Sequence, residues 1–429
     1  MRPDHDERLE LWFDFSCPYA YLASQKAPGI ARAAGCELVW KPMLLGGVWR
    51  GIGAGNGPMA TLGEAKAAHN LRDMRRWAAI FGVPFQMPSA HPMRTVRALR
   101  TLLGLPHSRW PAAIAAIYAA YWQRGEDVTR DDVIAAALRG AEVPAGEIAA
   151  ALADADSETI KAELRQRTDE AISLGIFGAP GWILRRDPPV LIWGQDRIAW
   201  VEAALAGWDL KSPPPGGPRP FGCDVQPFRS PSTIDVYFDV ASPFASFALA
   251  QLPELARVTG TTPVLHPILL GGLFRDLGQA DAPLLAMNDA KRRYTFEELD
   301  RWSRWWGEPF NMPRKFPQRT ITAQRLCVLA TGDARPRLAL ALGRAMWAQQ
   351  RDLENPEILR EILDGVGLPR DWVERTAEPA IKAELIRETT DAKQAGVFGV
   401  PTFIVDGKHL VWGQDRLDLV LRFAAGWQS

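Results

Sequence analysis

The stretch LELWFDFSCPYAYL, residues 9–22, decides the fold because it joins a strand to a helix at a reactive side chain. Its apolar opening predicts a strand that ends at a turn. PYAYL then predicts a helix with Pro18 in the first turn, where the N–H that proline lacks would have had no partner. Cys17 therefore stands at the start of that helix. The stretch IDVYFDVASPFASF, residues 234–247, repeats the pattern with Ser242 in the place of Cys17.

The similarity continues when the chain is slid along itself, which is the test for an internal repeat. At an offset of about 225 residues, KPMLLGGVWRGIG (41–53) faces HPILLGGLFRDLG (266–278). Nearer the C-terminus, LGIFGAPGWIL (174–184) faces AGVFGVPTFIV (395–405), and WGQDR occurs in both halves. The chain is therefore a tandem duplication, and its halves are called the first and second repeats below.

A segment rich in proline and glycine separates the repeats. KSPPPGGPRPFGCDVQPFRSPS, residues 211–232, resists regular structure and predicts a linker. The expected domains are residues 1–210 and 233–429, each of a size usual for one domain.

Within one repeat the patterns predict the order strand, helix, strand, a long helical block, two strands and a closing helix. Residues 95–174 are rich in alanine and are broken at Pro106, Gly125 and Pro144. Asp196 is expected to cap the closing helix. This order predicts an α/β fold with a mixed sheet, namely two tandem thioredoxin-like domains that each contain an α-helical insertion.

The composition excludes several classes of function. The 50 basic and 50 acidic residues balance, so no general affinity for nucleic acid or anionic membranes is expected. No apolar run is long enough to cross a bilayer, and the N-terminus shows no secretory signal. The four cysteines form no C-x-x-C motif, and with only six histidines we expect no metal site. A reducing, cytoplasmic setting fits this cysteine usage.

In this topology three features of each repeat are expected to meet near one edge of the sheet. They are the first residue of the first helix, a turn ending in proline, and a Gln-Asp pair before the closing helix. The residues are Cys17, Ala179, Pro180, Gln195 and Asp196 in the first repeat and Ser242, Val400, Pro401, Gln414 and Asp415 in the second.

The residue that opens the first helix has two interpretations. The positive end of a helix dipole stabilises an anion, so Cys17 would have a lowered pKa and act as a nucleophile. Ser242 would not ionise and could instead donate a hydrogen bond to the thiolate of another molecule. The alternative is that both are plain N-caps, which suits serine better than cysteine. The recurrence of the site favours a function.

The other motifs also have a structural and a functional interpretation. A proline after a small residue can be cis, and such a turn can pair Ala179 or Val400 with an extended, peptide-like ligand. A Gln-Asp pair can cap a helix or bind a ligand's charged ends. Asn56 faces Asp281 in a loop that is either flexible or near a ligand. Lys66 and Lys291 begin a helix in each repeat, either as solvated lysines or as anion contacts.

Taken in order, the motifs F-D-x-x-[SC]-P, [KH]-P-x-L-L-G-G, F-G-[AV]-P and W-G-Q-D-R resemble the 2-hydroxychromene-2-carboxylate isomerase family. That family is a branch of the DsbA-like thioredoxin superfamily and is similar to kappa-class glutathione transferases. The resemblance covers nearly the whole chain, twice. It implies glutathione as cofactor, and a catalytic serine that steadies the glutathione thiolate.

The resemblance places that serine at Ser242, and at Cys17 in the first repeat, which is a departure from the family. Its cis-proline maps onto Pro180 and Pro401. Its other glutathione contacts map onto Gln195 with Asp196, Gln414 with Asp415, Lys66, Lys291 and Asn56, the last replaced by Asp281 in the second repeat. Because the family's single domains form homodimers, it also implies that the two repeats pack as an intrachain pseudo-dimer, or that the chain itself dimerises.

The function expected first is therefore a glutathione-dependent cis–trans isomerase that acts on a small aromatic or chromene-like carboxylate in aromatic degradation. The alternative is a glutathione transferase or a monothiol-disulfide oxidoreductase that uses Cys17. A third possibility, from a different class, is a tandem domain that binds a ligand without catalysis.

Overall fold

The computed structural model describes residues 8–55, 57, 62–218, 233–278 and 283–428. The chain divides into two compact units. The first takes in the first repeat through Trp208 together with Asn288–Tyr294, and the second takes in the other described residues. Within the described ranges no helix is both long and apolar enough to span a bilayer. The linker predicted at 211–232 is described only to residue 218, and that part forms neither helix nor strand.

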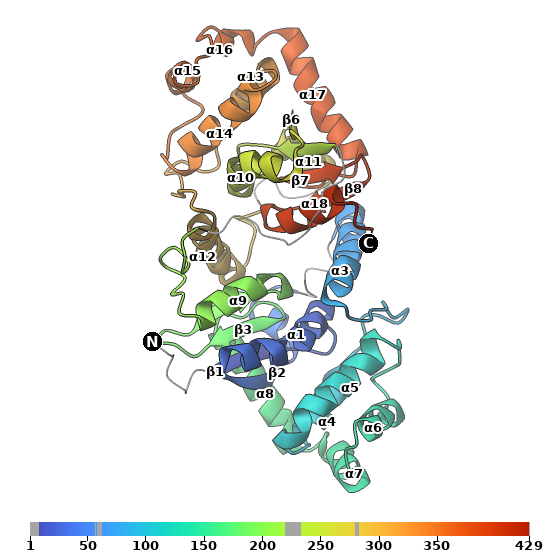
Figure 1. The fold of residues 1–429 in the computed structure, drawn as a ribbon. Coiled ribbons are helices and arrows are strands. Elements are labelled where there is room, and N and C mark those ends of the chain that lie inside the picture. The colour runs from blue at the N-terminus through green and yellow to red at the C-terminus, as the bar shows by residue number, and fades with distance from the viewer. Residues whose placement is uncertain (1–7, 56, 58–61, 219–232, 279–282, 429) are drawn as a thin grey trace. The chain divides into compact units, whose positions relative to one another are not determined.

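The predicted order of elements recurs in both repeats (Figure 1). The first repeat contains β1 (Arg8–Phe13), α1 (Pro18–Ala34), β2 (Glu37–Pro42), α2 (Leu45–Gly51), α3 (Glu64–Phe81), α4 (Val96–Leu103), α5 (Trp110–Trp122), α6 (Asp131–Gly140), α7 (Ala145–Asp154), α8 (Glu158–Ser173), β3 (Gly181–Leu184), β4 (Val190–Trp193) and α9 (Ile198–Leu205). The second contains β5 (Ile234–Phe238), α10 (Pro243–Thr259), β6 (Val264–Pro267), α11 (Leu270–Asp276), α12 (Asp289–Trp306), α13 (Ile321–Leu329), α14 (Ala334–Trp347), α15 (Pro356–Gly365), α16 (Trp372–Arg375), α17 (Pro379–Gln394), β7 (Thr402–Val405), β8 (His409–Trp412) and α18 (Leu417–Ala424).

Each repeat builds one mixed sheet of four strands. The strand order is β2-β1-β3-β4 in the first and β6-β5-β7-β8 in the second. β1 runs parallel to β2 and antiparallel to β3, and β3 pairs antiparallel with β4. The second sheet repeats these directions. The fold class predicted from the sequence, two tandem thioredoxin-like domains with helical insertions, is confirmed.

Aromatic side chains join the helical insertion to the end of the first strand. In the first repeat the rings of Phe15 and Tyr118 lie 5.0 Å apart, and the indole N–H of Trp122 donates to the Phe15 carbonyl at 2.8 Å. In the second, Trp347 donates to the Val240 carbonyl at 2.8 Å. The insertion therefore packs directly behind the loop that carries Cys17 or Ser242.

The expectation that Asp196 caps the closing helix is wrong. A 3-10 turn, Gln195–Arg197, precedes α9, and Arg197 occupies its N-cap position. The second repeat has the same turn at Gln414–Arg416. In each repeat the turn follows a glycine, Gly194 or Gly413, whose φ is near 105°. Residues other than glycine rarely adopt this backbone conformation. This glycine redirects the chain before the helix begins.

The sheet face that carries charged residues differs between the repeats. In the first, the Glu10 carboxylate accepts from Arg185 at 2.8 Å and lies 3.7 Å from Lys41. In the second, His266 occupies the position of Lys41 and bridges Asp235 at 3.0 Å and Glu388 at 2.9 Å. Burial lowers the pKa of His266, but the hydrogen bonds to the two carboxylates outweigh it and leave the pKa raised.

This raised pKa predicts how the stability of the second unit depends on pH. A histidine whose pKa is higher in the folded state contributes stability that is present below its unfolded pKa, about 6.5, and lost as the pH rises through the folded pKa. The variant His266→Lys carries the residue of the first repeat and stays charged throughout. We therefore expect the unfolding midpoint of the wild type, relative to this variant, to fall as the pH rises from 6 upward. A constant difference would contradict the assignment.

Candidate functional site

A buried aspartate after the first strand organises the site of the first repeat. The Asp14 carboxylate accepts from the backbone N–H of Ser16 at 2.9 Å and of Leu45 at 2.8 Å, and from the Thr95 hydroxyl. Burial raises its pKa, and these hydrogen bonds act in the opposite direction. Asp14 thus ties together the loop after β1, the start of α2 and the start of α4.

The second repeat makes the same three bonds. Asp239 accepts from the N–H of Ala241 and of Leu270 and from the Thr320 hydroxyl, each at 2.9 Å. Its pKa is likewise raised by burial. Neither aspartate was predicted as a site residue. The available signal was that an aspartate ends the strand at the same place in both repeats, where a buried charge needs a reason.

The aspartate backbone also places the first residue of the helix. The carbonyl of Asp14 accepts from the N–H of Cys17 at 3.1 Å, and that of Asp239 accepts from the N–H of Ser242 at 3.0 Å. Both residues take the extended conformation of an N-cap. Ser242 caps its helix, since its Oγ accepts from the N–H of Ala245 at 3.3 Å. Cys17 makes no such capping bond.

The Cys17 thiol is buried, and this reverses the expected direction of its pKa. Burial raises the pKa to about 12, although the backbone N–H groups of Ala20 and Tyr19 favour the thiolate. The thiol donates to the Ala179 carbonyl at 3.1 Å. The helix start therefore does supply the expected stabilisation, but loss of solvent around the sulfur exceeds it. Cys17 is therefore a neutral hydrogen-bond donor in this structure.

The proline turn lies directly against this donor. The Ala179-Pro180 and Val400-Pro401 peptide bonds are both cis. The Val400 carbonyl lies 3.5 Å from the hydroxyl of Ser242, as the Ala179 carbonyl lies 3.1 Å from the thiol of Cys17. The structure thus brings the first two of the three expected features together in each repeat.

The third feature joins them through the backbone. The Pro180 carbonyl accepts from the N–H of Gly194 at 3.0 Å, and that of Pro401 accepts from Gly413 at 2.9 Å. These glycines come immediately before the Gln-Asp pairs. The glycine of each F-G-[AV]-P motif is also required: a Cβ on Gly399 would lie 2.9 Å from the indole nitrogen of Trp412.

The glutamines of the two pairs are buried at the site. Gln195 is 3% exposed and Gln414 is 2% exposed. The Oε1 atom of Gln414 has no hydrogen-bond partner in the described part of the chain. Because a buried acceptor without a partner costs free energy, this atom is suited to receive a donor from a ligand. The adjacent Asp415 pairs with Arg416 at 2.8 Å, as Asp196 pairs with Arg197 at 2.9 Å.

The remaining predicted residues are two lysines and two loop residues. Lys66 lies half-buried in the first turn of α3, and burial is the largest cause that lowers its pKa. Lys291 lies in the first turn of α12. Asn56 and Asp281 lie outside the described residues. Among the described residues, no cluster of histidine, cysteine and carboxylate side chains could hold a metal ion.

Comparison with known proteins assigns the family. The model of the DSBA-like thioredoxin domain matches residues 8–206 and again residues 233–423. The chain belongs to the DsbA-like thioredoxin family.

Individual relatives cover half of the chain, as expected for a duplication. The 2-hydroxychromene-2-carboxylate isomerase of Sphingobium xenophagum is 31% identical over 195 residues, which are 44% of this chain and 95% of that relative. Glutathione S-transferase kappa 1 of Homo sapiens is 24% identical, over 44% of this chain and 89% of the relative. A solved 2-hydroxychromene-2-carboxylate isomerase aligns over 46% of this chain and all of its own, with 23% identity and a TM-score of 0.41.

The buried aspartate predicts a large effect on stability. The change Asp14→Ala leaves two backbone N–H groups and the Thr95 hydroxyl without an acceptor, at about 1–3 kcal/mol for each buried unsatisfied group. We expect the free energy of unfolding of the first unit to fall by about 3 kcal/mol or more, and Asp239→Ala to do the same in the second. Differential scanning calorimetry of the full chain is the measurement. The control is Asp154→Ala, which removes an exposed carboxylate and should change the free energy of unfolding little. If Asp14→Ala changed it as little as this control, the role assigned to Asp14 would be contradicted.

The pKa of Cys17 predicts its reactivity. With a pKa of about 12, roughly one thiol in ten thousand is ionised at pH 8. We expect iodoacetamide to label Cys17 far more slowly than the half-buried Cys36, with peptide mass spectrometry as the measurement. Labelling of Cys17 at pH 7 as fast as a free cysteine would show that its thiol ionises readily.

Proposed function

We propose that the protein is a glutathione-dependent cis–trans isomerase that acts on a small aromatic or chromene-like carboxylate. One observation carries the proposal: both repeats place a neutral hydrogen-bond donor, Ser242 or Cys17, at a helix start beside a cis-proline turn. A donor that stays protonated can stabilise an anion on another molecule, and cannot replace it as the nucleophile. The names of the relatives point to the same chemistry.

The residues present fit glutathione. The unpartnered Oε1 of the buried Gln414 suits an ammonium group, and the backbone at Val400 suits a peptide-like chain. Gln195 and Ala179 occupy the same places in the first repeat. We propose that Asp196, Asp415, Lys66 and Lys291 contribute charge to the same ligand, and that Asn56 and Asp281 contact it from the loop.

When bound, glutathione would supply a thiolate that adds reversibly to a conjugated double bond and allows it to rotate. The contribution of the chain is to hold that thiolate. To donate to it, the Ser242 hydroxyl turns away from the Val400 carbonyl, from which it is separated by 3.5 Å. Cys17 would do the same from Ala179, but a thiol is a weaker donor than a hydroxyl. The second repeat is therefore the better candidate for the active one.

The alternative functions remain distinguishable. A monothiol oxidoreductase requires an ionised Cys17, and its raised pKa disfavours that function. A glutathione transferase would use the same thiolate-holding site with a different second substrate, and the kappa-class relative supports this second candidate. We also propose a cytoplasmic location and, as the resemblance implies, packing of the two repeats as a pseudo-dimer.

The isomerase proposal predicts the effect of removing each donor. We expect Ser242→Ala to lower glutathione-dependent turnover of 2-hydroxychromene-2-carboxylate by roughly a hundredfold, the usual effect of losing one donor to a developing or bound anion. Cys17→Ala should have a smaller effect, because the thiol donates weakly.

The control is Ser157→Ala, which removes another serine N-cap, one that accepts from the N–H of Ile160 at 3.3 Å, away from the site. It should cost stability but not turnover. Turnover that survives Ser242→Ala and Cys17→Ala together would refute the site. Absence of any heat on titration with glutathione would refute both glutathione functions.

A further inference from the structure

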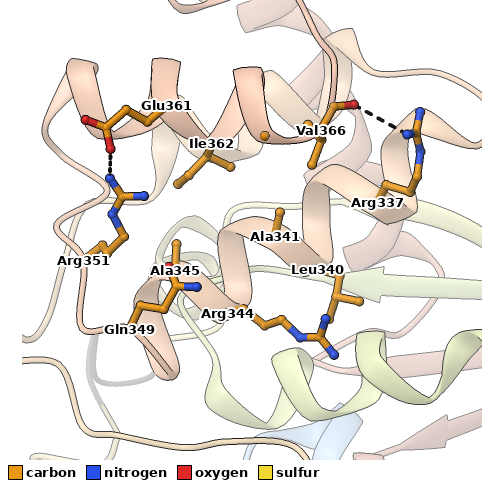
Figure 2. A pocket seen from close by; sticks show the side chains of 11 residues that line it. Arg337, Leu340, Ala341, Arg344, Ala345, Gln349, Arg351, Glu361, Ile362 and Val366 are labelled. Atoms are coloured by element: carbon orange, nitrogen blue, oxygen red, sulfur yellow. Dashed lines mark hydrogen bonds and ion pairs between the residues drawn. The ribbon is translucent and has the colours of Figure 1, made fainter.

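A surface groove lies between α14 and α15 of the second repeat, and none of the described residues of the candidate site lines it. Its volume is about 440 Å³, within the range of small-molecule sites. Figure 2 shows that Arg337, Leu340 and Arg344 line it from α14, while Glu361, Ile362 and Val366 line it from the side of α15.

The duplication shows why the groove is present here. The hydrogen bond from Arg351 N–H to the Ala345 carbonyl, 2.8 Å, repeats the one from Glu126 N–H to the Ala120 carbonyl, 2.9 Å. The two helix pairs therefore correspond residue by residue. At the repeat offset of about 225 residues, five alanines of the first repeat are replaced by larger side chains in the second. The alanines are Ala112, Ala115, Ala119, Ala136 and Ala137, and their counterparts in the same order are Arg337, Leu340, Arg344, Glu361 and Ile362. The first repeat therefore presents short side chains at this place, three of them exposed, whereas the larger side chains of the second repeat line a groove.

The charges in the groove are not equivalent. Arg344 forms a bidentate pair with Glu308 at 2.6 and 2.8 Å, and Arg351 pairs with Glu361. Arg337 contacts only backbone carbonyls, of Asp333 at 3.3 Å and of Val366 at 3.5 Å. Within the described ranges no carboxylate pairs with Arg337, and its Nη2 group donates to nothing. One guanidinium is thus left with donors for an anion.

We propose that this groove binds a small monocarboxylate with an apolar body. The carboxylate accepts from the fork of Arg337, whose planar geometry suits two oxygen atoms. The apolar body covers Leu340, Ala341 and Ile362, which form the floor between the charged ends. The site does not depend on the function proposed for the glutathione site.

The groove favours this class over other anions for two reasons. Only one of its three arginines is unpaired, so a phosphate with two charges is matched poorly. The floor is apolar, so part of the binding free energy comes from surface that inorganic ions lack. Arg351 at the other end is already paired with Glu361, so among the described residues that line this end no second free cation is present for a dicarboxylate.

The test uses the full chain and three probes: 2-naphthoate, the uncharged 2-naphthamide of the same shape, and inorganic phosphate. We expect calorimetric titration to show that 2-naphthoate binds with higher affinity than 2-naphthamide or phosphate. Arg337→Ala introduces the residue that the first repeat has at this position. It should lower the affinity for 2-naphthoate roughly tenfold or more, because that is the contribution of one charge-assisted hydrogen bond. Arg337→Lys keeps the charge without the fork and should bind with intermediate affinity.

Two further variants keep the test specific. Arg257→Ala removes an exposed arginine of α10 that pairs with Glu254, and should leave 2-naphthoate binding unchanged. Ala341→Glu places a carboxylate on the floor and should abolish the binding, with an unchanged melting temperature as the check on folding. The proposal is overturned if 2-naphthoate does not bind, if Arg337→Ala binds it as the wild type does, or if 2-naphthamide or phosphate binds equally well.

Discussion

The rest of each repeat depends on one buried carboxylate after its first strand. A carboxylate out of water is stable only when it accepts several hydrogen bonds, and Asp14 and Asp239 each accept three. The donors come from the loop after that strand, from the first residue of α2 or α11, and from the threonine that precedes α4 or α13. These elements must therefore be in place together. The same aspartate fixes Cys17 or Ser242 through its carbonyl.

Cys17 and Ser242 occupy the same position of the two repeats, and both are neutral hydrogen-bond donors there. Their chemistry therefore differs less than a thiol and a hydroxyl would suggest. A helix start lowers the pKa of a cysteine, but burial of Cys17 removes the water that the charge needs. Both repeats consequently present a neutral donor beside a cis-proline turn. Such a site suits a cofactor that brings its own thiolate, and for this reason we propose glutathione chemistry rather than redox chemistry of the chain.

The two repeats keep the site and differ elsewhere. The charged face of the sheet uses Lys41 in the first and His266 in the second, so we expect this face of the second sheet to respond to pH near neutrality. The helix pair α5 and α6 carries alanines at five positions where α14 and α15 carry larger side chains that line a groove. Because the two repeats share one fold, equivalent positions can be compared directly. A residue that differs between them identifies a property that only one repeat has.

The sequence by itself determined the duplication and the order of elements, because repeated patterns and strand-to-helix transitions are local signals. The meeting of the three motifs was expected only through the topology that this order implies. Only the tertiary structure decided the ionisation of Cys17, since the burial of its sulfur comes from distant residues. It also showed that Asp196 does not cap α9 and that Asp14 receives a donor from Thr95, 81 residues away. Burial, cavity volume and contacts between distant segments are properties of the packed chain, and no short stretch of sequence encodes them.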